Sequence, residues 1–157
     1  MNPEVQLCEH LRARDPASLR IEPDDIFDWS DGPVTAIARC ARCPQLGVLE
    51  LLDWSRSRRV RIFALSGLEP EPLALYRRDV TRGSCDPARL AQETAALFAA
   101  AGPVERIVAI ELERNAVLGS VVPAPDFRFP PAPWPQRQPG RDDDSWFAEL
   151  GLDKSGA

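Results

Sequence analysis

The sequence has almost no lysine and almost no histidine, the residue most often used as a general base. Lys154 is the single lysine among the 19 basic residues, and His10 is the single histidine. The nine glycines are scattered, with no Gly-Lys-Ser/Thr or Gly-x-Gly-x-x-Gly loop, so nucleotide-dependent chemistry has no support. The formal net charge of −5 argues against a protein whose main task is to coat nucleic acid or an anionic membrane.

Long apolar runs are also missing. The longest, near residues 95–101 and 107–110, are far shorter than the ~20 residues that a membrane-spanning helix needs. Residues 1–8 have neither the basic start nor the apolar run of a signal peptide. We therefore expect a cytoplasmic protein without a membrane span, in which thiols stay reduced. Under these conditions the four cysteines favour metal binding over disulfides.

The composition divides the 157 residues into two parts. With 44% hydrophobic and 27% charged residues, most of the chain has the balance of a globular domain. Seven of the 16 prolines lie between positions 123 and 139, where they exclude a helix or a central strand. We expect a zinc-stabilised α+β domain over residues 1–122 and a Pro-rich extended tail over 123–157.

Hydrophobic periodicity predicts the α+β class, with a mainly antiparallel sheet and one covering helix. The helix is expected over 86–101, because Asp86 can cap it, Pro87 suits its first position and Gly102 follows its end. The expected strands are 34–39, 47–54, 59–65, 73–77, 105–112 and 116–122, the last two forming a hairpin.

Two short motifs bring together the residue types that bind zinc. Cys40 and Cys43 form a Cys-x-x-Cys turn at the end of a predicted strand, and Cys8 and His10 lie two apart, on one side of an extended segment. Together they make the Cys3His set of a closed tetrahedral site, similar to a zinc-ribbon-like knuckle near the N-terminus. Four protein ligands leave no open position, so we expect a structural zinc ion.

Other interpretations of these residues are open. Buried cysteines also serve as small core residues without a metal. If residues 44–57 form a helix, the region around Cys40 and Cys43 resembles a thioredoxin-like unit and implies thiol redox chemistry. Cys85 lies beside a predicted helix start, where its pKa can fall, but a catalytic Cys–His pair would require His10.

Six arginines between positions 39 and 61 stand against two acids, which gives this stretch a local charge of +4. Arg56, Arg58 and Arg59 are therefore candidate contacts for RNA, DNA or an acidic partner. The segment 22–31 contains five acids and no base, so it could instead cover these arginines.

The end of the tail predicts a short amphipathic helix. Acids at 142–144 precede Trp146, Phe147 and Leu150, whose apolar side chains are expected to dock on the protein's own core or on a protein partner.

We thus expect a non-enzymatic, zinc-containing binding or assembly protein. A thiol redox protein using Cys40 and Cys43, and a nucleic-acid-binding module using the 39–61 arginines, are the alternatives.

Overall fold

The computed structural model describes residues 2–12, 19–29, 33–55, 59–81, 86–114 and 116–123. Its elements in chain order are α1 (Glu9–Arg12), β1 (Leu19–Trp29), β2 (Pro33–Cys40), β3 (Leu46–Ser55), β4 (Val60–Leu68), α2 (Pro70–Thr81), α3 (Pro87–Ala99), β5 (Val104–Glu111) and β6 (Ala116–Val121).

The six strands form one sheet in the order β1-β2-β3-β4-β5-β6, and every neighbouring pair is antiparallel. The α+β class with an antiparallel sheet is therefore confirmed. Strands β2 to β6 coincide with five of the predicted segments to within a few residues, including the β5–β6 hairpin. The predicted helix over 86–101 is also confirmed as α3, since the Asp86 carboxylate caps it by accepting from the Arg89 amide at 2.7 Å.

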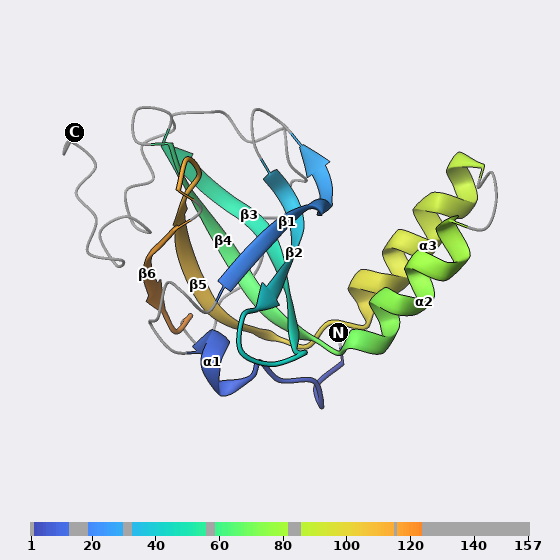
Figure 1. Ribbon diagram of the computed structural model, residues 1–157, viewed down its shortest axis with the longest axis horizontal. Helices are drawn as coiled ribbons and strands as arrows, with labels where there is room; N and C mark the ends of the chain where they lie inside the picture. The colour runs from blue at the N-terminus through green and yellow to red at the C-terminus, as the bar shows by residue number, and fades with distance from the viewer. Residues whose placement is uncertain are drawn as a thin grey trace.

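The predicted strand over 73–77 is wrong, because this segment lies within α2. Prolines in the first turn of a helix cost little, so Pro70 and Pro72 start α2 rather than prevent it. Leu73 and Tyr76, three residues apart, then face the same apolar cluster beside the sheet. The prediction of one covering helix is corrected in the same way: α2 and α3 pack side by side and extend together away from the sheet (Figure 1).

The acidic segment 22–31, for which no strand was predicted, lies largely in the edge strand β1. Pro23 is tolerated there because an edge strand has one unpaired side. The Asp25 side chain is 1% exposed and accepts from Arg39 Nε at 2.6 Å and from Arg77 Nη2 at 2.7 Å. This carboxylate thus joins β1 to β2 and α2, and the acidic segment does cover part of the arginine cluster.

The sheet has two apolar faces, because successive side chains of a strand alternate between them. Phe63 and Leu65 of β4 point to one side, here called the Phe63 face, where Leu7 and Leu11 pack against the strands. Ile62 and Ala64 point to the opposite side, the Ile62 face. Helices α2 and α3 pack on one end of that opposite side, through a separate cluster that includes Leu73 and Leu97.

Candidate metal centre

The turn between β2 and β3 presents two of the predicted ligands. Cys40 ends β2, and its backbone N–H donates to the carbonyl of Gln45 at 3.1 Å, which closes a tight loop that contains Cys43. The Arg42 amide donates to the Cys40 Sγ at 3.4 Å. The loop therefore turns both sulfurs to one side and places a backbone donor on one of them, as expected of a metal-binding knuckle.

The other two ligands lie in the N-terminal arm, residues 2–12. The extended conformation predicted for Cys8 and His10 is wrong, because Cys8 directly precedes α1 and His10 lies in its first turn. The Cys8 carbonyl accepts from the Arg12 amide at 3.2 Å, and the Cys8 Sγ accepts from the Leu11 amide at 3.4 Å. A single helical turn thus brings the two side chains together where the sequence predicted an extended pair.

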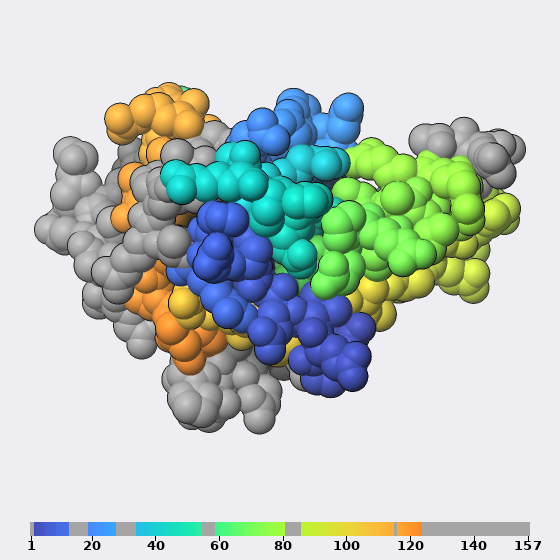
Figure 2. All heavy atoms as spheres, turned by 60° about the horizontal axis from the view of Figure 1, so that its bottom comes forward, coloured from blue at the N-terminus to red at the C-terminus, as the bar shows by residue number. Residues whose placement is uncertain are grey.

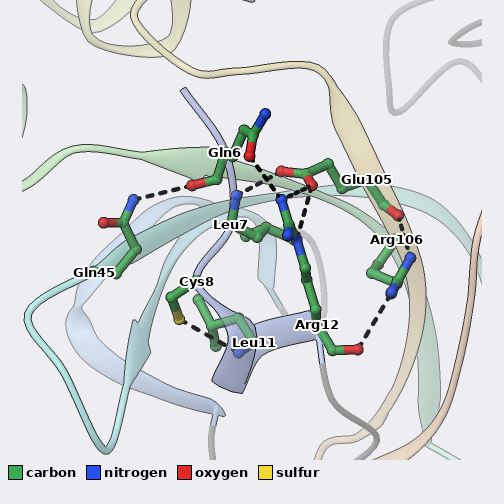
Figure 3. Close-up of polar contacts among 8 residues, drawn as sticks. All are labelled: Gln6, Leu7, Cys8, Leu11, Arg12, Gln45, Glu105 and Arg106. Carbon is green, nitrogen blue, oxygen red and sulfur yellow. Dashed lines mark hydrogen bonds and ion pairs between the residues drawn. The ribbon is translucent and has the colours of Figure 1, made fainter. Parts of the chain in front are cut away.

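The carboxylate of Glu105 on β5 holds this arm against the sheet (Figure 3). It accepts from the Leu7 amide at 2.5 Å and from Arg12 Nη2 at 2.8 Å and Nε at 3.1 Å. The Gln45 side-chain amide donates to the carbonyl of Gln6 at 3.3 Å and to that of Leu68 at 3.1 Å. These contacts fix the arm beside the β2–β3 turn, where its two ligands meet Cys40 and Cys43.

Two glycines allow the arm to lie directly on the backbone beneath it. A Cβ on Gly67 would lie 2.6 Å from the carbonyl carbon of Gln6, and one on Gly102 would lie 2.0 Å from the carbonyl oxygen of Val5. Real Cβ atoms essentially never approach so closely, so any side chain here would displace the arm. Figure 2 shows the arm, in dark blue, lying across this end of the molecule beside the β2–β3 region and the start of α2.

The structure brings the four predicted ligands together. One donor atom from each of Cys8, His10, Cys40 and Cys43 lies within 4.8 Å of the other three. Tetrahedral zinc with bonds of ~2.0–2.3 Å requires separations of roughly 3.3–3.8 Å, so a movement of about 1 Å closes the set around an ion. Cys40 is buried and the others are partly buried, at the edge of the apolar cluster of the Phe63 face.

The environment of His10 fits a metal ligand. Its Nδ1 is buried and has no hydrogen-bond partner among the described residues, although buried polar atoms are nearly always paired. Its Nε2 lies 3.8 Å from the Glu9 carboxylate. A histidine that binds zinc through one nitrogen commonly has a carboxylate near the other, so Nδ1 would be the ligand atom and Glu9 the outer partner.

The pKa values of the Cys8 and Cys40 thiols are shifted in opposite directions. Burial raises the pKa of the Cys8 thiol to about 11, because a thiolate there would lose water, while the Leu11 amide partly offsets this effect. For Cys40 burial also acts to raise the pKa, but hydrogen bonds from the Arg42 amide and from the Cys43 and Cys8 thiols outweigh it and lower the pKa. Hydrogen bonds thus favour the thiolate at Cys40, whereas burial disfavours it at Cys8.

The candidate arginine surface is not a continuous basic face in the described residues. Arg39 pairs with Asp25, which raises the Arg39 pKa, and Arg61 is 4% exposed. Arg59 forms an ion pair with Glu113. Arg56 and Arg58 lie outside the described residues, as do Cys85 and the tail residues Trp146, Phe147 and Leu150.

The helix that the thioredoxin-like interpretation requires over 44–57 is not present, since strand β3 covers Leu46–Ser55. The Cys-x-x-Cys segment therefore connects two adjacent antiparallel strands and does not stand at a helix N-terminus, as a thioredoxin-like redox motif would.

The residues that position the arm could not be found from the sequence. Glu105 follows a Gly-Pro break and looks like any polar residue at a strand start, while Gln45 is one of several glutamines. Gly67 carried the weak signal of a glycine inside a strand, which often marks a close backbone approach.

Comparison of the chain with protein-family models, with curated proteins and with solved structures finds no match. Among the described residues, no helix has the length and apolar character needed to span a bilayer.

Proposed function

We propose that this is a zinc-binding protein whose metal ion is structural, and that it acts in binding or assembly rather than in catalysis. The observation that carries the proposal is the convergence of Cys8, His10, Cys40 and Cys43, together with the buried Nδ1 of His10, which has no partner among the described residues. Three thiolates and one imidazole would fill the four positions of tetrahedral zinc and leave none for a substrate.

A zinc ion held here would join the N-terminal arm to the β2–β3 turn. The two halves of the site are separated by residues 11–39, so the ion closes a long loop and restricts the unfolded chain, much as a disulfide does. A domain of about 120 residues has a modest core, and such a cross-link supplements it.

The proposed contact surface for a protein partner is the end of the tail. Trp146, Phe147 and Leu150 form an apolar group on a segment too short to be stable alone, which supports docking on another surface. The arginines at 39–61 offer less support for nucleic acid, because Arg39 and Arg59 already form ion pairs within the chain.

The test is metal content and cobalt spectroscopy of the full chain. Wild type is expected to bind one zinc per chain and to give the intense thiolate-to-cobalt absorption of a tetrahedral Cys3His site. Cys43→Ser should lose stoichiometric zinc, whereas the matched control Cys85→Ser should keep it. Wild type without bound zinc, or with a reversible Cys40–Cys43 disulfide in its place, would contradict the proposal and favour a thiol redox protein.

A further inference from the structure

The Ile62 face of the sheet contains a buried apolar cluster that the described helices do not cover. Its six members are all strand residues and each is at most 2% exposed: Leu52, Val60, Ile62, Ala64, Ile107 and Ala109. The partly buried residues that pack against it, Val104 and Val121, are also in strands. An apolar sheet face needs a second layer to be shielded from water, so this cluster requires a cover.

The cover does not come from the described elements outside the sheet. The N-terminal arm contributes Leu7 and Leu11 to the opposite side of the sheet, the Phe63 face. Helices α2 and α3 contribute Leu73 and Leu97 to the separate cluster at the other end of the Ile62 face. No apolar member of the Ile62 cluster comes from any of these three.

The parts of the chain outside the described residues differ sharply in what they can offer. The internal stretches 13–18, 30–32, 56–58 and 82–85, and position 115, contain no leucine, isoleucine, valine, methionine or aromatic residue. The segment after residue 123 contains Phe127, Phe129 and Trp134 within its first eleven residues. Apart from Met1, only this segment among the undescribed parts of the chain has large apolar side chains with which to cover a cluster of this size.

The chain also leaves the sheet at the right place. Val121, at the end of β6, pairs with Ile107 and packs against the cluster, and the described chain ends two residues later. The distance from β6 across β5 and β4 to β3 is about 15 Å at ~4.8 Å per strand. An extended proline-rich segment at ~3.1 Å per residue crosses it with about five residues, and residues 124–139 provide 16.

We propose that residues 124–139 of the same molecule pack on the Ile62 face, with Phe127, Phe129 and Trp134 against the cluster around Ile62 and Ile107. The proline-rich segment is then part of the folded domain, and the residues after it, including Trp146 and Phe147, remain for a partner. This inference does not depend on zinc, because the Ile62 face is opposite the side on which the ligands pack.

Photo-cross-linking of the full chain tests this proposal. Benzoylphenylalanine replaces Phe127, Phe129 or Trp134 in three separate proteins, and the matched control carries it at Leu90, which is 40% exposed on α3. After irradiation, monomer and dimer bands are separated and the cross-linked peptides are identified by mass spectrometry. Each variant is first checked by circular dichroism for the wild-type fold.

At least one of the three tail probes is expected to cross-link within the monomer to the strands that carry Leu52, Ile62 or Ile107, and the Leu90 probe is not. Cross-links found only between two copies would overturn the proposal in favour of exchange or a dimer. Folded variants in which none of the three tail probes reaches these strands would also overturn it, whether or not the protein binds zinc.

Discussion

Replacing Glu105 should weaken zinc binding although Glu105 does not belong to the ligand set. Its carboxylate is the common acceptor for the Leu7 amide and the Arg12 guanidinium, the two contacts that flank Cys8 in the arm. In Glu105→Ala both donors lose this acceptor. The free-energy cost of ordering the arm is then larger, and the arm must be ordered before Cys8 and His10 can bind the ion.

The magnitude follows from these contacts. A hydrogen bond to a charged group contributes roughly 1.5–3 kcal/mol when buried, but the Arg12 side chain is 37% exposed and its ion pair is screened by water. We therefore assign the whole interaction about 2 kcal/mol, most of it from the Leu7 amide. If arm docking and zinc binding are coupled, this corresponds to about a 30-fold weaker zinc affinity.

The assay is a competition titration of the full chain against a chromogenic zinc chelator at fixed pH. Glu4→Ala, an exposed change in the same arm, is the matched control and should keep wild-type affinity. A zinc affinity of Glu105→Ala within twofold of wild type would refute the reasoning, because it would mean that the arm reaches the ion without this contact.

Three further predictions concern stability and the position of the arm. Asp25→Ala should lower the free energy of unfolding by about 3 kcal/mol in a urea titration, because Arg39 and Arg77 lose the buried carboxylate that they share. In the same titration the control Asp24→Ala, an exposed change, should lower it by under about 0.5 kcal/mol. Burial raises the pKa of Glu50 above 4.5, so the folded state binds the proton more tightly and its stability falls as pH rises through that pKa. Glu50→Gln should remove this fall and be the more stable protein at pH 7 but not at pH 4; equal differences at both pH values would exclude the effect. Gly67→Ala should detach the arm and weaken zinc binding at least tenfold in the chelator titration, and unchanged affinity would show that the Gln6 backbone can move aside.

Local sequence patterns predicted the strands and the helix whose own residues specify their conformation. Alternating side chains predicted β4, and Asp86 with the following proline predicted the start of α3. The pattern failed where two conformations fit the same residues: Leu73 and Leu75 alternate as in a strand, yet the spacing of Leu73 and Tyr76 also fits a helix, and tertiary packing selects the helix. Strand β1 was missed because Pro23 and several acids interrupt its apolar residues, and the partners of Asp25, Arg39 on β2 and Arg77 on α2, are encoded by no local pattern.

The same distinction applies to the metal centre. The identities of the four ligands could be predicted because cysteine and histidine are rare in this chain and closely spaced within each pair. Their convergence depends on Glu105 and Gln45, which are remote in sequence from the ligands that they position. The conformation of the Cys8–His10 pair was predicted wrongly for a related reason: the single turn of α1 is held by local bonds to Cys8 and also by the contacts of Arg12 with the remote Glu105.

The order of the strands has a consequence for how the chain folds. Each strand pairs with its neighbours in sequence, so most of the sheet can form by successive local pairings, with one long excursion through α2 and α3 between β4 and β5. The arm is different, because its hydrogen bonds join residues 6–12 to positions 45 and 105. Those partners come together only after β5 has paired with β4. We therefore expect the arm to dock late, after the sheet has formed, so that a metal ion binds only to a nearly folded chain. Metal binding should then slow unfolding more than it speeds folding.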